Sequence, residues 1–135
     1  MLKTAILWPA IVQAVLIFAL YVRLGFVRRR AVASGAVPST NFPPWADEPP
    51  AAREMRRHLA NQYELPVLFF VVVGFLFLID GISIVELTVA WLYILFRILH
   101  SIGALSGPLM LRHGAFTLAF LCVVFLWIDL AVRLI

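Results

Sequence analysis

The chain has 135 residues, of which 64% are hydrophobic and only 13% charged, and its mean hydropathy is +1.01. Because soluble domains carry roughly half apolar and a quarter charged residues, this composition excludes a soluble globular fold and indicates a lipid environment. The net charge of +4 would suggest nucleic acid in a soluble protein. Here the placement of the arginines along the chain accounts for it, and no nucleic-acid partner is expected.

Four segments are long and apolar enough to cross a membrane, which takes about 20 residues each. They cover about residues 6–27, 59–79, 84–105 and 115–134. The first is too long for the apolar part of a secretion signal and is followed by arginines rather than by a cleavage site, so we expect it to be retained. The sequence therefore predicts one domain of all-α class, an integral membrane four-helix bundle.

The connections between these segments differ in length. The first, over about residues 31–52, contains five prolines and is expected to form neither helix nor sheet. Asp80 and Gly81 make a tight turn between the second and third segments, and the third connection is also short. Short connections favour antiparallel neighbours in a compact bundle.

Arginines gather on one side of this arrangement. Arg112 lies in the third connection, the second offers Asp80 and Glu86, and six arginines flank the first connection: Arg28, Arg29, Arg30, Arg53, Arg56 and Arg57. Positively charged connections stay on the cytoplasmic side, so both termini are predicted to face away from the cytoplasm. Arg28, Arg29 and Arg30 also suit anionic lipid headgroups. The motifs favour a bacterial inner membrane.

The second segment carries a polar stripe. Arg53, Arg57, Asn61 and Glu64 are spaced by four, four and three residues, which places them on one face of a helix. Ionisable groups inside a membrane usually face a bundle interior or a water-filled cavity, so this stripe is a candidate site. Pro66 removes a backbone donor and is expected to loosen the helix near Asn61 and Glu64.

Further polar residues lie on the third and fourth segments. Arg97 and His100 share a face at a similar depth, and a Glu64–Arg97 ion pair is expected. Asp129 and Arg133, four residues apart, are expected to pair at the non-cytoplasmic boundary. His58 and His113 are expected at the interface, and the spacing of histidines and acids predicts no metal site.

The arrangement Arg57-x-x-x-Asn61-x-x-Glu64, followed by a proline early in the second of four helices, resembles the MAPEG family (membrane-associated proteins in eicosanoid and glutathione metabolism). The segments "NQYELPVLFF" and "FRILHSIGAL" are especially similar to uncharacterised bacterial members, and the resemblance covers essentially the whole chain. It implies a homotrimer of four-helix bundles, with glutathione held between neighbouring subunits near the cytoplasmic side.

The same resemblance implies roles for individual residues. Arg112 and Arg97 would be catalytic through stabilisation of the glutathione thiolate, and the ligand-binding residues would be Arg30, Arg53, Arg57, Asn61, Glu64 and His100. Chemistry agrees with these roles, because arginine forks bind the two carboxylates of glutathione and a carboxylate such as that of Glu64 binds its ammonium. A nearby guanidinium would also lower the pKa of the thiol.

The sequence leaves three functions open. The first is a glutathione-dependent transferase or peroxidase acting on a lipophilic electrophile. The second is a non-catalytic member that binds a lipid or a partner protein. It is favoured by Leu65, His100 and Ala104, which stand where glutathione-using members commonly have tyrosines. The third is a small transporter or channel, although the broken helices in repeated halves that a transporter would show are not visible.

Overall fold

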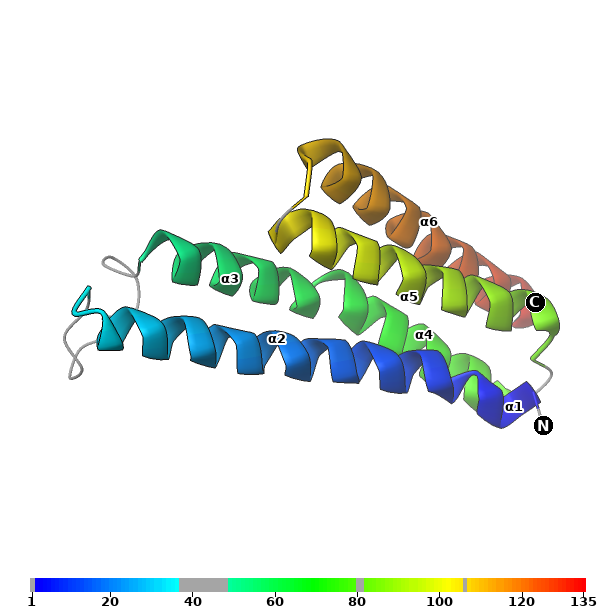
Figure 1. Ribbon diagram of the computed structural model, residues 1–135. Coiled ribbons are helices and arrows are strands. Elements are labelled where there is room, and N and C mark those ends of the chain that lie inside the picture. Colours follow the sequence, from blue (N-terminus) through cyan, green and yellow to red (C-terminus); the bar gives the residue numbers. More distant parts are fainter. Residues whose placement is uncertain (1, 37–48, 80–81, 106) are drawn as a thin grey trace.

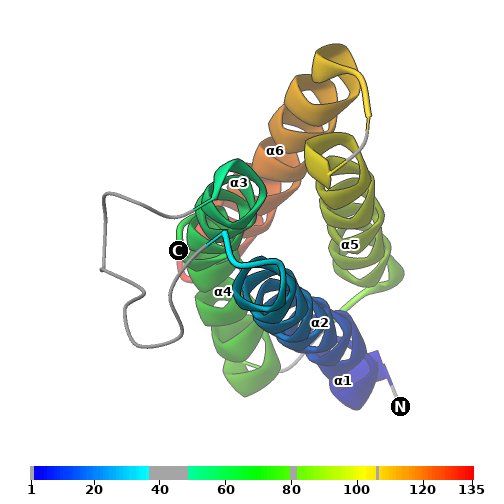
Figure 2. The same cartoon turned by 60° about the vertical axis from the view of Figure 1, so that its left-hand side comes forward.

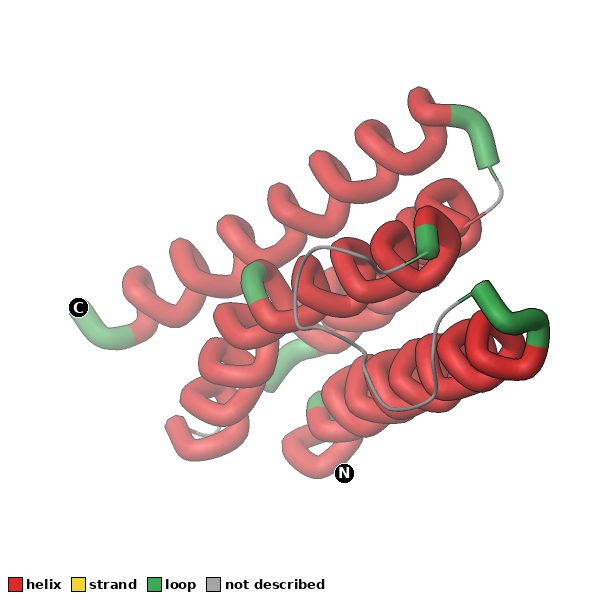
Figure 3. The backbone as a smooth tube through the Cα atoms, turned by 90° about the vertical axis from the view of Figure 1, so that its left-hand side faces the viewer, coloured by secondary structure: helices red, strands yellow, loops and turns green. Residues whose placement is uncertain are grey.

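The protein is helical throughout the part of the chain that the structure describes, residues 2–36, 49–79, 82–105 and 107–135 of a computed structural model (Figures 1 and 3). Its elements are α1 (Leu2–Ala5), α2 (Leu7–Ala33), α3 (Pro50–Ala60), the 3₁₀ helix η1 (Asn61–Tyr63), α4 (Leu65–Ile79), α5 (Ile84–Leu105) and α6 (Leu109–Arg133). Four helical segments are long and apolar enough to span a membrane: Lys3–Ala33, Pro50–Ile79, Ile84–Leu105 and Leu109–Arg133. The predicted all-α fold with four membrane helices is confirmed.

The helices pack as two neighbouring pairs. The long α2 lies along the rod made by α3, η1 and α4, while α5 and α6 form an antiparallel hairpin beside them (Figures 1 and 2). Both termini lie at the same end of the bundle, and the C-terminal end of α2 and the start of α3 extend past the α5–α6 connection at the other end (Figure 1). We call these two ends the terminal end and the opposite end.

The first connection is partly helical, so the prediction of an irregular stretch over about residues 31–52 was wrong at both its ends. The helix α2 continues to Ala33, and Gly35 follows it with φ 72°. Pro50 begins α3, because the first position of a helix needs no backbone N–H and suits the fixed φ of proline. Residues 37–48 lie outside the described residues.

The third connection is shorter than the sequence indicated, whereas α4 ends at Ile79 and α5 begins at Ile84, the bounds that the sequence indicated. Pro108 precedes α6, so Arg112 and His113 lie inside this helix rather than in a loop. Glu86, grouped with the second connection by its charge, lies in the first turn of α5. The predicted Asp80–Gly81 turn falls outside the described residues.

The rod of α3 and α4 is interrupted near its middle, as the sequence predicts from Pro66. Without an N–H, this proline cannot donate to the carbonyl of Gln62 four residues earlier. The chain tightens into η1, and Glu64 leaves helical geometry with φ −93° and ψ −87°. In a 3₁₀ helix three residues make a turn, so η1 changes which side chains of this segment face the other helices.

Apolar packing holds the bundle together from inside and meets lipid outside. One core joins α4, α5 and α6, where the rings of Phe69 and Tyr93 stack with their centroids 3.9 Å apart. A smaller core joins α2 to α3 through Leu24 and Met55. Large apolar side chains such as Phe18 also cover the outer surface, which is the pattern expected for a membrane protein.

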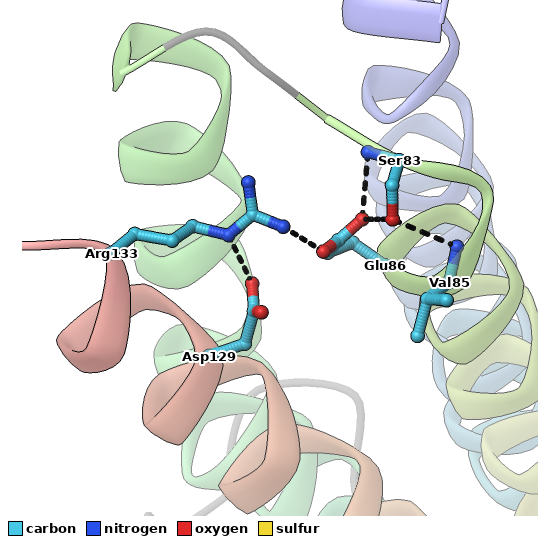
Figure 4. Close-up of polar contacts among 5 residues, drawn as sticks. All are labelled: Ser83, Val85, Glu86, Asp129 and Arg133. Atoms are coloured by element: carbon cyan, nitrogen blue, oxygen red, sulfur yellow. Dashed lines mark hydrogen bonds and ion pairs between the residues drawn. The ribbon is translucent and has the colours of Figure 1, made fainter.

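A polar cluster fastens α5 to α6 at the terminal end, and we call it the terminal clamp: Ser83, Glu86, Asp129 and Arg133 (Figure 4). Glu86 is 2% exposed and accepts hydrogen bonds from the backbone N–H of Ser83 (2.7 Å), from the Ser83 hydroxyl and from Nη2 of Arg133. Nε of Arg133 donates to Asp129 at 2.7 Å. The predicted Asp129–Arg133 pair is confirmed, and Glu86 extends it across two helices.

Candidate functional site

A polar cavity of about 120 Å³ lies near the opposite end, where α3, the end of α5 and the start of α6 meet. Its lining residues are Glu54, Arg57, His58, Ala104 and Arg112. The fold thus brings together two of the residues singled out in the sequence, Arg57 and Arg112, although 55 positions separate them. Glu54 and Arg57 are exposed, so the polar cavity can be reached from outside the protomer.

Arg112 is held in place by α5. A Cβ atom added to Gly103 would lie 2.9 Å from the backbone nitrogen of Arg112 and 3.1 Å from its Cα, so only glycine allows this approach. One turn earlier, Nδ1 of His100 lies 3.0 Å from the carbonyl oxygen of Arg112. Because a carbonyl only accepts, this ring nitrogen carries the hydrogen. Two residues of α5 therefore fix the backbone from which the Arg112 guanidinium reaches the cavity.

The polar stripe of the second segment faces outward from the protomer. Arg53, Arg57 and Glu64 are exposed, and Asn61 is half-buried. Arg30, on α2, is exposed as well. Of these residues, only Arg57 lines the polar cavity. The stripe is therefore a charged outer surface beside the cavity rather than a lining of the bundle interior.

A second polar group lies inside the bundle, and we call it the interior polar cluster: Gln13, His58, Gln62, Arg97 and His100, all buried. Nη2 of Arg97 donates to Oε1 of Gln62 at 2.7 Å, and the Gln13 side chain donates to the same oxygen at 3.2 Å. The Gln62 amide nitrogen lies 3.5 Å from Nε2 of His58. The cluster links α2, α3, η1 and α5 through side chains alone.

The prediction of a Glu64–Arg97 ion pair is wrong, because the ion pairs among the described residues do not include it. Arg97 is fully buried and contacts Gln62 and, at 3.4 Å, the carbonyl of Asn61, whereas Glu64 is exposed. The physical reason is the 3₁₀ turn: it directs Gln62 toward α5 and leaves Glu64 outside. His58, expected at the interface, is 4% exposed and belongs to both the cluster and the cavity wall.

Sequence reasoning missed three residues of these sites: Gln13, Gln62 and Glu54. A signal existed for the first, because a lone glutamine within an apolar membrane segment is expensive unless it finds a partner. The spacing of four between His58 and Gln62 also places both on one helix face. Glu54 had no such signal. It belongs to the site because it shares the polar cavity with Arg112, and that depends on how the start of α6 packs near α3.

Residues 6–132 match the sequence profile of one protein family, described as the MAPEG family. The chain belongs to the MAPEG family. A search of curated proteins and a search of solved structures each return no match. Membership makes this an integral membrane protein of a family concerned with glutathione and eicosanoid metabolism, in agreement with the resemblance that its motifs suggested.

In this MAPEG protein the residues that carried the family resemblance divide among three places. Arg57 and Arg112 line the polar cavity, and Arg97 and His100 belong to the buried network behind it. Asn61 and Glu64 lie on the outer surface beside the cavity. His58 connects the two, because it lines the cavity and lies against His100 with ring centroids 5.4 Å apart. Within the described residues no three His, Cys, Asp or Glu side chains come close enough to hold a metal ion. The site thus offers charge and hydrogen bonds.

Proposed function

We propose that this MAPEG protein is a glutathione-dependent transferase or peroxidase that acts on a lipophilic electrophile reached from the bilayer. The observation that carries the proposal is the meeting of Arg57, Arg112 and Glu54 around one cavity. Two guanidinium groups and one carboxylate complement a tripeptide with two carboxylates and one ammonium. Arginine binds carboxylates through two parallel N–H groups, which adds orientation to charge.

In this proposal the ligand extends beyond the protomer. A cavity of about 120 Å³ is too small for a whole tripeptide, so glutathione would continue onto the exposed stripe of Arg53, Asn61 and Glu64, with Arg30 nearby on α2. Charged side chains at membrane depth are costly when they face lipid, so another polar surface is expected to pack against this stripe. We propose that a neighbouring subunit of a homotrimer provides it.

The chemistry would be carried by the glutathione sulfur. Arg112 would stabilise the thiolate, and in a transferase the sulfur forms a bond to the electrophilic carbon while the leaving group departs with its electron pair. In a peroxidase the thiolate attacks a hydroperoxide oxygen, the O–O bond breaks, and the alkoxide takes a proton. A second glutathione then reduces the sulfenic acid to disulfide and water. Arg97 would act as a positioning residue that holds the η1 turn through Gln62 and the Asn61 carbonyl.

We further propose that the opposite end, with the polar cavity, faces the cytoplasm of a bacterial inner membrane. The arginines near the end of α2 and those of α3 support this orientation through the positive-inside rule. Single cysteines at Ser34 and at Ile135, in a Cys122→Ala background, test it with a membrane-impermeant thiol reagent on intact cells. Labelling at position 135 but not at position 34 is expected, and the reverse pattern would overturn the orientation.

The enzyme proposal is tested by calorimetry of glutathione binding to the purified oligomer. Arg57→Ala and Arg112→Ala are each expected to weaken binding about tenfold or more, since each removes a charge-assisted hydrogen-bonding partner. Arg112→Ala should also abolish the ultraviolet absorbance of the bound thiolate. Arg29→Ala, an exposed arginine on α2 away from the cavity, is the matched control and should bind normally. A folded oligomer that binds no glutathione at millimolar concentration would refute the proposal.

One observation favours a second candidate, a non-catalytic protein that binds a lipid. Among the described residues no hydroxyl group lines the polar cavity: Ala104 occupies its wall, and Leu65 and His100 are buried. An apolar groove of about 340 Å³ between α4 and α6, which includes Leu65 and Trp127, suits an acyl chain. Lipid mass spectrometry on the purified protein distinguishes the two functions, because a stoichiometric lipid together with no glutathione binding would favour this one.

A further inference from the structure

We infer that the interior polar cluster is a binding site for a small monovalent inorganic anion, such as chloride or bicarbonate, held inside each protomer beside Arg97. This site is separate from the proposed glutathione site, and its existence does not depend on the enzyme proposal. The inference rests on the direction of the hydrogen bonds, on the polar atoms that they leave without partners, and on a buried charge that no carboxylate contacts.

The hydrogen-bond directions in the cluster follow from chemistry. Arginine only donates, so the Gln62 atom that contacts Arg97 is its carbonyl oxygen, and its amide nitrogen must face His58. That amide nitrogen donates to Nε2 of His58, which therefore carries no hydrogen. A neutral His58 then bears its hydrogen on Nδ1. Nδ1 is buried and has no hydrogen-bond partner among the described residues.

Unpartnered donors exceed unpartnered acceptors around Arg97. Its Nε and Nη1 atoms are buried without a partner and together carry three hydrogens, and the Nδ1 hydrogen of His58 adds a fourth. The unpartnered acceptors are Oε1 of Gln13 and Nε2 of His100, while the Tyr93 hydroxyl can serve either way. All these side chains are at least nine-tenths buried. Such a surplus of donors is what an anion requires.

Charge gives the second reason. Arg97 is fully buried, and within the described residues no carboxylate contacts it. A buried charge without a partner is strongly destabilising. The carboxylate of exposed Glu64 acts on this charge without contacting it. A small anion in contact with Arg97 would satisfy both the hydrogen bonds and the charge, whereas water would satisfy the hydrogen bonds alone. The terminal clamp shows the usual solution in this same protein, because buried Glu86 has Arg133 beside it.

Burial limits the anion to a small one, and the polar cavity offers its route. The side chains with unpartnered donors, Arg97 and His58, are at least nine-tenths buried. His58 also lines the polar cavity together with Arg57 and Arg112. The positive charge of these arginines would attract an anion to the entrance.

Bromide is the probe for the experiment, because it mimics chloride and can be located by anomalous scattering. The thermal midpoint of the oligomer in detergent is measured while bromide replaces gluconate at constant ionic strength. Wild type and the exposed-arginine control Arg29→Gln are expected to rise by about 3–6 °C, and Arg97→Gln not at all. Bromide-soaked crystals should show an anomalous peak beside Arg97.

A second variant covers the case in which Arg97→Gln does not fold. Gln62→Glu places a carboxylate next to Nη2 of Arg97 and so supplies the negative charge from within. It should fold, be more stable than wild type in gluconate, and show no response to bromide. A wild-type midpoint that bromide does not change, a crystal with only water beside Arg97, or a full bromide response in Gln62→Glu would each overturn the inference.

Discussion

The terminal clamp and the interior polar cluster each contain a buried charged side chain, but these two side chains have different partners. Glu86 is 2% exposed and meets Arg133 and two donors of Ser83. Arg97 is fully buried, and among the described residues its guanidinium donates only to the Gln62 amide oxygen and, at 3.4 Å, to the Asn61 carbonyl. A charge with all its partners within the protein serves to fasten helices, as Glu86 joins α5 to α6. A buried charge that no carboxylate contacts is the basis of the anion site inferred above.

The difference follows from position along the helices. The clamp lies at the terminal end, where α5 begins and α6 finishes, so a long side chain such as Arg133 can reach between helices and remain 27% exposed. The interior polar cluster lies within the bundle, surrounded by apolar side chains and by lipid. Substitutions in the two clusters should therefore differ in size and in their response to ligands.

The largest effect is expected in the interior. Gln62→Leu removes the acceptor used by Arg97 and Gln13 and the donor to His58, so three buried polar groups lose their partner at once. A loss of about 3–5 kcal/mol in the free energy of unfolding is expected, measured by denaturant titration in mixed micelles. A loss below about 1 kcal/mol would show that these groups find other partners, and the contrast between the clusters would disappear.

A smaller loss is expected in the terminal clamp. Glu86→Ala removes the acceptor of the Ser83 hydrogen bonds and one of the two carboxylates that contact Arg133. Arg133 keeps its ion pair with Asp129 and its partial contact with solvent. The expected loss is about 2 kcal/mol by the same titration, and glutathione and bromide responses should stay unchanged. Glu86→Gln retains an acceptor for Ser83 and should lose about half as much. If Glu86→Ala abolished a ligand response, the clamp would not be a purely structural fastener.

Gly103→Ala tests the contact between α5 and the start of α6. The added Cβ would meet the Arg112 backbone at 2.9 Å, so α6 must shift, with an expected loss of about 1–2 kcal/mol and weaker glutathione binding. Gly114→Ala, in the same hairpin, is the control: no atom lies within 4 Å of its Cβ, and it should gain up to about 1 kcal/mol of helix propensity. Equal effects of the two substitutions would contradict a special approach at Gly103.

The smallest effect belongs to Asp129→Asn. The Asp129–Arg133 pair is an i,i+4 contact near the end of α6, and both side chains are partly exposed. Such pairs contribute about 0.5 kcal/mol, and Glu86 would still hold Arg133. The thermal midpoint should fall by no more than about 3 °C. A larger fall would indicate that Asp129, rather than Glu86, is the main partner of this arginine.

Much of the architecture followed from the sequence. Hydrophobic segments of membrane length predicted four helices, Pro66 predicted the break that η1 makes, and the spacing of Asp129 and Arg133 predicted their pair. The prolines of the first connection misled the assignment of its boundaries, because Pro50 begins a helix as readily as it ends one. The motif of Arg57, Asn61 and Glu64 indicated the family to which the profile match assigns the chain.

Local pattern therefore determined which segments lie in the membrane, how many membrane helices the chain has and which family it resembles, since these depend on composition and spacing along one segment. Only the tertiary structure decided that Gln62, rather than Glu64, meets Arg97, and that Glu54 and Arg57 share a cavity with Arg112. In a segment that is apolar on all sides, periodicity does not reveal which face turns inward. That choice is made by contacts between residues that are distant in the sequence, such as the hydrogen bond from Arg97 to Gln62, which are 35 positions apart.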